Sequence, residues 1–265
     1  MNERNSEDME QFEYFSEFKI PEGNYLVMRA DGRTFHSITE KLGLEKPFDK
    51  RLRDMMVSTV AKLMESNEFN IVLAYIQSDE ISLAFKNSNI FNGRIEKLNS
   101  IIAAYISVEL NKELARDGFG QLIDAHSLTI IFDSRIIVLP TLEVVKKYFL
   151  NRQKNCMNNA LHSYCYYSLR QNGVNQTQAE KMLNEMKTDG KKEMLRVKFG
   201  IIFDEIPLWQ RLGTVLYFEL FKKQAVNQKT HEKVEVYRKR ILIKEADDFI
   251  QKHDILNDII NQAFM

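Results

Sequence analysis

Apolar and polar residues follow distinct periods along the first third of the chain. Residues 25–30 form a near-continuous apolar run, which is typical of a buried strand. From Asp49 to residue 66, apolar residues recur three and four positions apart, as on one face of an amphipathic helix, and Asp49 stands where an N-cap belongs. Two more apolar runs, 71–76 and 81–85, flank four polar residues. This pattern predicts a strand, a helix and a β-hairpin, in that order.

The next segment predicts a second helix, over residues 94–114, a loop around 118–126 and a strand within 127–139. We expect the polar Asp133-Ser134-Arg135 to break that strand. The resulting order of strand, helix, hairpin, helix and strand is typical of the split βαβ arrangement, in which helices cover an antiparallel sheet. The predicted fold class is therefore α+β.

The rest of the chain is predicted to be mainly helical. The predicted helices are 141–171, 177–186 and 244–265, and a basic helical segment follows the second of them and continues to residue 198. The predicted strands are 201–203 and 214–221. We expect residues 1–140 to form the catalytic domain with an N-terminal tail. Residues 141–265 should be a helical and strand extension that completes the same globular unit, with long C-terminal helices.

The N-terminal tail is polar and acidic, because residues 1–22 hold seven acidic residues against two basic ones. We expect the tail to form a short helix that packs on the body of the protein. Its docking residues would be Phe12, Tyr14, Phe15 and Phe18.

Charge limits the partners only weakly. The chain has 37 basic and 37 acidic residues and a formal net charge of zero, so its overall charge does not indicate a nucleic-acid partner. Basic residues gather at 187–198 and at 238–240. Each cluster could be a solvated surface or part of a basic face, and 187–198 could contact phosphate groups of a partner.

The two cysteines and the absence of long apolar runs indicate a soluble cytoplasmic protein. Cys156 and Cys165 lie in one predicted helix, where nine residues separate their Cα atoms by about 13 Å, too far for a disulfide. No apolar run approaches the roughly 20 residues that span a bilayer, so no membrane partner is expected. Free thiols fit a reducing compartment.

Candidate chemistry lies at the end of the first strand and at the tip of the hairpin. Asp31-Gly32 follows the strand, and Asp79-Glu80 occupies the tip. Carboxylates in a turn are commonly turn-formers. If both strands share one sheet, however, Asp31, Asp79 and the Gly32 carbonyl become hard oxygen ligands that suit Mg²⁺. Two such ions can clamp the attacking and leaving oxygens of a phosphoryl displacement.

Basic residues around this pair could neutralise phosphate charge, which is most of what phosphoryl transfer requires of a protein. They are Arg29, Arg33, Lys46, Lys97 and Arg135. No Walker-type loop, dinucleotide fingerprint or zinc spacing competes with this interpretation.

Several blocks in this order closely resemble the tRNA-histidine guanylyltransferase family. They are residues 29–36 (RADGRTFH), 46–49 (KPFD), 74–80 (AYIQSDE), 132–135 (FDSR) and 152–153 (RQ), extended by 192–193 (KE) and 213–216 (GTVL). The resemblance implies a polymerase palm-like domain that runs in reverse. Such an enzyme adds nucleotides to the 5′ end of RNA, in the 3′-5′ direction.

The resemblance also implies roles for individual residues. Asp31, Gly32 and Asp79 would hold two Mg²⁺ ions, and Asp31, Asp79 and Glu80 would be catalytic, with Glu80 either a further ligand or an orienting group. The implied nucleotide-binding residues are Arg29, Asp31, Gly32, Arg33, Thr34, Phe35, His36, Lys46, Asp49, Ser78, Asp79, Lys97, Arg135 and Asn159. Simpler alternatives are an N-cap for Asp49, a core position for His36 and solvated positions for Lys97 and Asn159. We expect His126, His162 and His231 at the surface.

One departure from the family pattern bears on the substrate. Enzymes dedicated to tRNA-histidine carry His-Ile-Asn-Asn where this chain has Met157-Asn158-Asn159-Ala160. That difference resembles the guanylyltransferase-like branch, which repairs 5′-truncated tRNA by copying the opposite strand. We therefore expect template-dependent repair after ATP activation of the 5′ phosphate, with addition of one guanosine as the alternative.

The implied partners are tRNA and the substrates ATP and GTP or another nucleoside triphosphate, and the implied assembly is a homotetramer built as a dimer of dimers. Two other functions remain open on the residues alone. A nucleotide cyclase or dinucleotide synthase could use a similar palm, and an RNA-binding chaperone could retain vestigial carboxylates.

Overall fold

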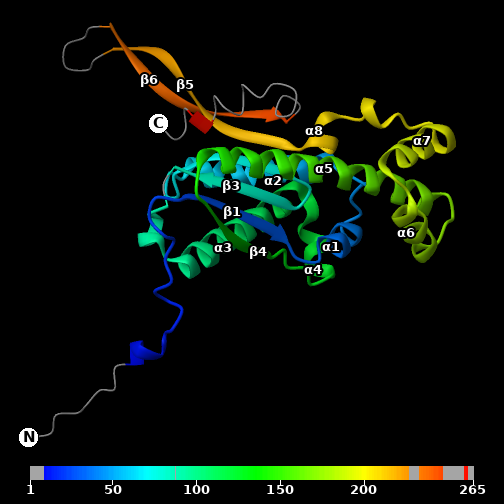
Figure 1. The fold of residues 1–265 in the computed structure, drawn as a ribbon, viewed down its shortest axis with the longest axis horizontal. Coiled ribbons are helices and arrows are strands. Elements are labelled where there is room, and N and C mark those ends of the chain that lie inside the picture. Colours follow the sequence, from blue (N-terminus) through cyan, green and yellow to red (C-terminus); the bar gives the residue numbers. More distant parts are fainter. Residues whose placement is uncertain (1–8, 87, 227–232, 247–259, 262–265) are drawn as a thin grey trace, which may run out of the picture.

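A single antiparallel sheet runs through the molecule and carries helices on both faces (Figure 1). The computed structural model describes residues 9–86, 88–226, 233–246 and 260–261. The sheet has six strands in the order β4-β1-β3-β2-β5-β6. The strands are β1 (Tyr25–Gly32), β2 (Ile71–Gln77), β3 (Glu80–Phe85), β4 (Phe132–Leu139), β5 (Thr214–Val226) and β6 (Lys233–Glu245).

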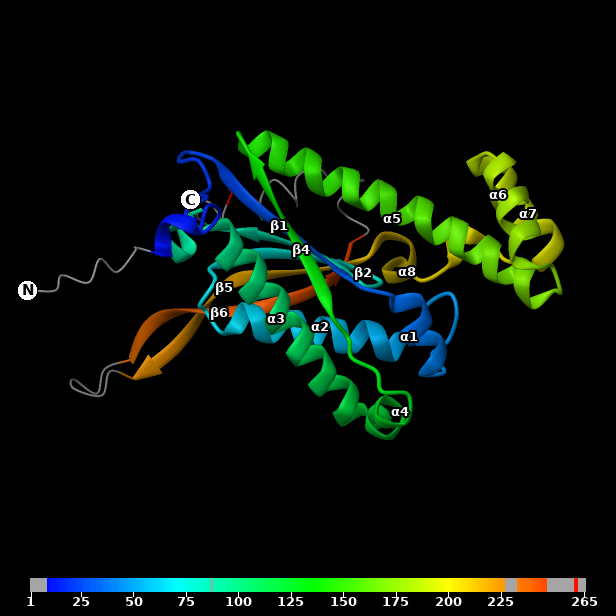
Figure 2. The same cartoon turned by 90° about the horizontal axis from the view of Figure 1, so that it is seen from below.

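Two helices cover one face of the sheet and one long helix covers the other (Figure 2). The α-helices are α1 (Phe35–Lys41), α2 (Lys50–Glu65), α3 (Ile95–Leu114), α4 (Gly120–Ala125), α5 (Leu142–Gln171), α6 (Gln176–Glu185), α7 (Thr188–Phe199) and α8 (Leu208–Leu212). Shorter turns are η1 (Met9–Phe12), η2 (Ile90–Gly93), η3 (Ala115–Phe119) and η4 (Phe203–Glu205). Helices α2 and α3 pack on one face, and α5 crosses the other. No described helix has the length and apolar character that a membrane crossing requires.

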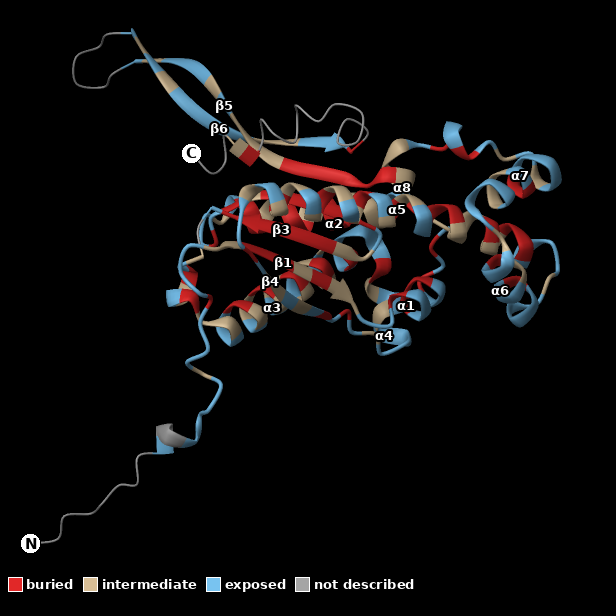
Figure 3. Cartoon of the chain, viewed as in Figure 1, coloured by how far each residue is buried: buried red, intermediate tan, exposed pale blue. Residues whose placement is uncertain are grey.

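The two-residue period of β1 divides the core between these faces. Leu26 and Met28 belong to the cluster beneath α2 and α3, whereas Val27 belongs to the cluster beneath α5. A third cluster joins the far end of α5 to α6 and α7. Buried positions therefore follow both faces of the central strands (Figure 3). The predicted α+β class and the split βαβ sheet are confirmed, since β1, α2, the β2–β3 hairpin, α3 and β4 occur in that order.

Three local predictions in the middle of the chain were wrong. The expected strand at 201–203 is replaced by η4, in which Phe203 packs into the third core cluster instead of pairing with a strand. The expected loop at 118–126 is mostly helical, because Gly118, at a φ of 89°, redirects the chain from α3 into α4. Residues 133–135 do not break β4: this edge strand accepts polar side chains, and the Ser134 hydroxyl donates to the Asn99 carbonyl at 2.9 Å.

Two predictions at the termini also need correction. Lys244 and Glu245 end β6 instead of starting a helix, because thirteen residues of β6 pair with β5. Most of the predicted C-terminal helix lies outside the described residues. The N-terminal aromatic residues are not docked, since Phe12, Tyr14, Phe15 and Phe18 are 54%, 73%, 66% and 57% exposed.

Candidate active site

The β2–β3 turn and the end of β1 form one acidic edge of the sheet. Ser78 and Asp79 make a two-residue turn, with Ser78 at a φ of 52°. In the register of β1 with β3, Asp31 lies opposite Glu80, and the Gly32 N–H donates to the Asp79 carbonyl at 3.2 Å. The sheet thus brings the end of the first strand beside the hairpin tip, as the sequence predicted.

Gly32 allows this close approach. A Cβ built on Gly32 would lie 2.4 Å from the Phe35 ring and 3.1 Å from the Asp79 Cβ. These distances leave no room for a side chain beside a ring that packs in the core, so the backbone at Gly32 must stay bare. Because Gly32 has no side chain, Asp79 can lie directly against the end of β1.

Asp79 is a carboxylate with little compensating charge. Burial raises its pKa to about 6, and the neighbouring negative charges of Asp31 and Glu80 add to the rise. Burial lowers the pKa of Lys46, and Glu40 and Asp79 oppose that effect. Neither Asp31 nor Asp79 forms an ion pair with a cation in the described part of the chain. The edge of the sheet therefore holds excess negative charge, with Lys46 as a nearby cation.

Glu80 differs from its neighbour because it is compensated. Arg152 of α5 donates from Nε to the Glu80 Oε1 at 2.7 Å and from Nη2 to Oε2. The two side chains are only 14% and 17% exposed. Both oxygens of Glu80 are thus engaged by a bidentate guanidinium, which favours an orienting role over that of a free metal ligand.

A cavity of about 530 Å³ opens beside this acidic edge. It lies between the hairpin tip, α1, the loop before α2, the far half of α5 and the segment around α8. Most of the residues predicted for catalysis or nucleotide binding line it: Asp31, Phe35, His36, Lys46, Asp49, Ser78, Asp79, Glu80 and Asn159. His36 is exposed at the cavity and is not a core residue.

The remaining predicted residues lie outside the cavity lining, as Gly32 does. The Arg33 N–H donates to the Ile131 carbonyl at 2.9 Å, and Thr34, at a φ of 52°, precedes α1. On the sheet, Arg29 lies opposite Arg135 of β4, and Arg135 pairs with Asp133 at 3.4 Å. Lys97 of α3 lies 5.4 Å from the centre of the Phe91 ring. A nucleotide confined to the cavity would not touch these side chains.

The sequence did not identify part of the cavity lining, which we call the aromatic and polar wall. Arg53, Ser163, Tyr167, Trp209 and Thr214 line the cavity, and none was predicted. The ring centres of His36 and Tyr167 lie 6.3 Å apart with the planes at 15°, and Lys46 Nζ lies 5.8 Å from the Tyr167 ring centre. Arg152, Asn155, Asn159 and His162 recur along α5 as a polar stripe, which was a sequence signal for this wall. The direction in which the stripe points depends on packing in the third core cluster.

His162 was also placed wrongly, because it lines the cavity and is not a simple surface residue. Lys191 Nζ lies 3.4 Å from its Nδ1, and burial, followed by the charge of Lys191, lowers the pKa of His162. His126 is exposed, as expected, and His231 lies outside the described residues. The predicted free thiols are confirmed for Cys156 and Cys165, which are buried and unlinked.

Asp49 acts primarily as a structural cap. Its carboxylate accepts from the backbone N–H of Glu45 at 2.9 Å and of Arg51 at 2.8 Å, and it pairs with the Arg51 guanidinium at 2.6 Å. Burial alone would raise the pKa of Asp49, but these bonds lower it to about 2. Asp49 therefore fixes the loop that carries Lys46 to the start of α2.

Comparison with known proteins assigns the chain to a family. A family model described as tRNAHis guanylyltransferase matches residues 6–140, and a second, described as the Thg1 C terminal domain, matches residues 143–258. The chain belongs to the tRNAHis guanylyltransferase family. A probable tRNA(His) guanylyltransferase of Dictyostelium discoideum is 33% identical over 91% of this chain and 93% of its own length. A tRNA(His) guanylyltransferase of Debaryomyces hansenii is 31% identical over 88% and 91%.

Solved structures of this family share the fold. A bacterial tRNA(HIS) guanylyltransferase (Thg1)-like protein in complex with ATP matches with a TM-score of 0.71 and 22% identity, over 95% of this chain and 96% of that one. The tRNA(His) guanylyltransferase of Saccharomyces cerevisiae matches with a TM-score of 0.66 and 24% identity, over 76% and 88%. The predicted family, the palm-like fold and the enzyme class, a nucleotidyltransferase, are thereby confirmed.

The acidic edge of the sheet offers carboxylate oxygens that suit Mg²⁺. The described residues contain no group of three or more acidic, histidine or cysteine side chains arranged for a metal. Mg²⁺ is commonly held by one or two carboxylates together with substrate phosphates and water. Asp31 and Asp79 supply two carboxylates that form no ion pair among the described residues, and both line the cavity. The residues present therefore fit Mg²⁺ bound together with a nucleotide.

Proposed function

We propose that this protein is a 3′-5′ nucleotidyltransferase that adds nucleotides to the 5′ end of tRNA. Family membership supports the reaction class, and the observation that carries the proposal is the cavity itself. It brings two carboxylates that form no ion pair among the described residues, Asp31 and Asp79, together with a cation, Lys46. Phosphoryl transfer needs this combination of metal ligands and phosphate partners.

The reaction would proceed in two phosphoryl transfers at this edge. The RNA 5′-monophosphate first attacks the α-phosphate of ATP and releases pyrophosphate, which gives an adenylylated 5′ end. The 3′-hydroxyl of the incoming nucleotide then attacks the 5′-phosphate, forms a phosphodiester bond and releases AMP. An RNA that carries a 5′-triphosphate needs only the second transfer and releases pyrophosphate. The bacterial relatives solved with ATP and with GTP support both nucleotides as substrates.

Two Mg²⁺ ions, held by Asp31, Asp79 and the Gly32 carbonyl, would neutralise phosphate charge and stabilise the attacking and leaving oxygens. Lys46 and Asn159 line the same cavity and would contact the triphosphate. Arg29, Arg33 and Arg135 form a separate set near the end of β1, which would contact a nucleotide or RNA that extends beyond the cavity.

Glu80 would support the reaction indirectly, by holding the hairpin tip that carries Asp79 in place. Since Arg152 engages both of its oxygens, Glu80 fixes the strand that follows Asp79 and leaves metal binding to its neighbours. The pair ties the hairpin tip to α5, which also carries Asn159 and Tyr167 into the cavity. Both walls of the cavity are therefore joined at one point.

Within this reaction class we propose template-dependent repair of 5′-truncated tRNA. The support is the sequence Met157-Asn158-Asn159-Ala160, where the enzymes dedicated to tRNA-histidine are expected to carry a histidine. Asn159 lines the cavity, whereas Met157 packs against buried residues beneath α5. The relatives of Dictyostelium discoideum and Debaryomyces hansenii carry the name of tRNA(His) guanylyltransferases, so addition of one guanosine is the second candidate.

The deciding experiment supplies a tRNA that lacks its first nucleotide and carries a 5′-monophosphate, together with ATP, all four nucleotides and Mg²⁺. Four versions of the tRNA differ only in the base opposite the missing position. Repair predicts that the added nucleotide changes to match that base. Addition of guanosine to all four, or to intact tRNA-histidine alone, would favour the second candidate. Cyclic products from ATP or GTP without RNA would contradict both.

We also propose a homotetramer, a dimer of dimers in a cytoplasmic setting, on the strength of the family resemblance. Light scattering of the purified chain tests the assembly, and a monomer at micromolar concentration would contradict it.

A further inference from the structure

One part of the sheet extends beyond the rest of the protein. β5 pairs with β2 only from Thr214 to Tyr217, whereas its pairing with β6 continues to Val226. Residues 219–226 and 233–240 therefore form a two-stranded ribbon, with which no third strand pairs in the described part of the chain. The ribbon leaves the body as a separate arm (Figure 1), and its surface is mainly exposed (Figure 3). A two-stranded ribbon alone is marginally stable in water, so its projection calls for a reason.

The ribbon carries a positive charge that the rest of the chain offsets. Its acidic residues are Glu219 and Glu235, and its basic residues are Lys222, Lys223, Lys233, Arg238, Lys239 and Arg240. Six basic residues against two acidic ones give these sixteen residues a net charge of +4, while the whole chain has a net charge of zero. Basic charge concentrated in a projecting element favours a polyanionic partner.

Part of this charge is already paired within the ribbon. Arg240 pairs with Glu219, and Lys222 pairs with Glu235 at 3.1 Å. Among the residues that the structure describes, Lys223, Lys233, Arg238 and Lys239 take part in no ion pair. These four cations remain available to phosphate groups of a partner.

Aromatic side chains lie between the basic ones. Arg240 lies 5.2 Å from the Phe221 ring centre on one face of the ribbon, and Lys222 lies 5.8 Å from the Tyr237 ring centre on the other. Tyr237 is 66% exposed. Exposed rings beside cations provide stacking surfaces for unpaired bases as well as charge for the backbone, which is the combination found at RNA-binding surfaces.

The ribbon is connected directly to the cavity. Thr214, the first residue of β5, lines the cavity, and Val226 is the last residue of the same strand. At about 3.3 Å per residue, the strand extends roughly 40 Å from the cavity to the far end of the ribbon. An RNA whose 5′ end lies in the cavity could therefore reach the ribbon only through a part far from the reacting end.

We propose that the ribbon binds the sugar-phosphate backbone of the RNA substrate at a distance from its 5′ end. The inference rests on the proposed function, because it takes the RNA to be the molecule whose 5′ end enters the cavity. A second copy of the chain is a poorer partner for this element, since two ribbons of charge +4 would repel each other.

The test is a triple variant, Lys223→Gln/Arg238→Gln/Lys239→Gln, of the full chain. The affinity for a full-length tRNA labelled at its 3′ end is measured between 50 and 200 mM salt. Each lost phosphate contact should reduce the slope of log affinity against log salt by about 1, so we expect a slope smaller by about 2 to 3 and an affinity at least 10-fold weaker at the lower salt. The matched control is Lys86→Gln/Lys154→Gln/Lys181→Gln, which removes the same charge from exposed lysines elsewhere.

Two further measurements test whether the loss of tRNA affinity arises at the ribbon and not at the cavity. ATP and GTP affinities should be unchanged in the triple variant, because the ribbon residues do not line the cavity. A short RNA hairpin with the same 5′ end should bind both proteins equally, since it is too short to reach the ribbon. Both measurements, like tRNA binding, can be made whether or not the protein adds nucleotides, so failure of the proposed reaction is seen separately in the wild type.

Equal tRNA affinity and salt slope in the triple variant and the wild type would overturn the inference. An equal loss in the control variant would also overturn it, because the effect would then reflect overall charge. Loss of tRNA binding together with a smaller assembly in light scattering would instead assign the ribbon to contact between copies of the chain.

Discussion

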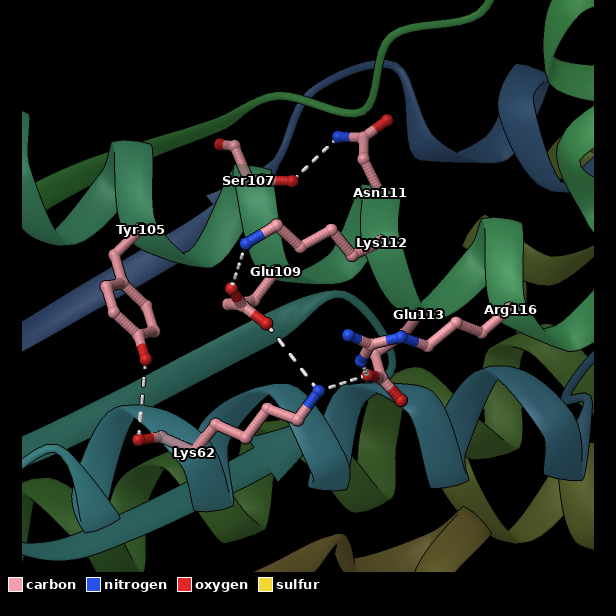
Figure 4. A network of polar contacts seen from close by, with 8 residues as sticks. All are labelled: Lys62, Tyr105, Ser107, Glu109, Asn111, Lys112, Glu113 and Arg116. Carbon is pink, nitrogen blue, oxygen red and sulfur yellow. Dashed lines mark hydrogen bonds and ion pairs between the residues drawn. The ribbon is translucent and has the colours of Figure 1, made fainter.

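Two groups of carboxylates in this protein differ in how their charge is compensated. Between α2 and α3, Lys62 contacts both Glu109, at 3.5 Å, and Glu113, while Lys112 and Arg116 each pair with one of them at 2.7 Å (Figure 4). Hydrogen bonds from Lys112 to Glu109 and from Lys62 to Glu113 lower the pKa of each glutamate.

The cavity presents the opposite arrangement. Asp79 is half-buried beside another carboxylate, and its pKa is raised to about 6. Charges that stabilise a fold are normally paired, because a buried unpaired charge costs free energy. The acidic edge keeps that cost, which indicates that its counter-ions arrive with a ligand. Carboxylates whose charge is paired with a lysine or arginine thus act as structural groups here, whereas the unpaired ones fit a catalytic role.

Replacement of Asp79 by Asn should have the largest effect and tests this contrast directly. We expect nucleotide addition to fall at least 1,000-fold, about 4 kcal/mol in activation free energy, because one of the two carboxylates proposed to bind Mg²⁺ is lost. The melting temperature should stay equal or rise, since a like-charge contact is removed. Asp124→Asn, on the exposed surface of α4, is the matched control and should retain activity. Full activity of Asp79→Asn would sink the proposed site.

Arg152→Ala should have the next largest effect, because it leaves Glu80 with no counter-ion in a nearly buried position. We expect a loss of about 3 kcal/mol in the free energy of unfolding, measured with denaturant. The double variant Arg152→Ala/Glu80→Gln should recover much of this loss, since it removes the stranded charge. If the two single losses simply add in the double variant, the pair does not act as a unit.

Asp49→Asn tests a carboxylate whose compensation is structural although it lines the cavity. The folded-state pKa of Asp49 is lowered to about 2 from an ordinary 3.8. A lowered pKa contributes stability that is present above about pH 4 and is lost as the pH falls towards 2, on the order of 2 kcal/mol here. Asp49→Asn should therefore be less stable than the wild type at pH 7, with the difference shrinking at pH 2 to 4. A constant difference across this window would contradict the mechanism.

Lys62→Ala should have the smallest effect. Lys62 is 33% exposed and each glutamate keeps a second cation, so we expect a loss of about 1 kcal/mol and a melting temperature lower by about 2 to 4 °C. Nucleotide addition should be unchanged, because the network lies away from the cavity. If Lys62→Ala lost activity but kept its full stability, paired charge would not distinguish the Lys62 network from the acidic edge of the cavity.

The parts of the fold that the sequence predicted are those specified by local pattern. The apolar spacing of α2 and the turn between β2 and β3 are local signals, and the end of β1 beside that turn followed from the split βαβ order. Residues 201–203 and 244–245 were misassigned, because packing of Phe203 and pairing with β5 decide their conformation. The conformations of these residues depend on contacts with distant parts of the chain, and no periodic pattern in the local sequence indicates them.

The site divides in the same way. Asp31 and Asp79 were predictable, since each follows or joins a recognisable strand. The aromatic and polar wall was not, because Tyr167, Trp209 and Thr214 reach the cavity only through packing of α5, α8 and the start of β5. Arg152 belongs to the sequence block 152–153, but its contact with Glu80 spans 72 residues of chain and has no local signal.

The contact of Glu80 with Arg152 has a consequence for how this sequence can vary. One partner lies in the segment 6–140 and the other in 143–258, which two separate family models describe. A change at either position alone leaves a nearly buried charge, whereas a joint change to a neutral pair leaves none. Related chains should therefore replace the two residues together. A chimera that joins the first segment of one relative to the second segment of another should fold well only where both parents carry matching residues at these two positions.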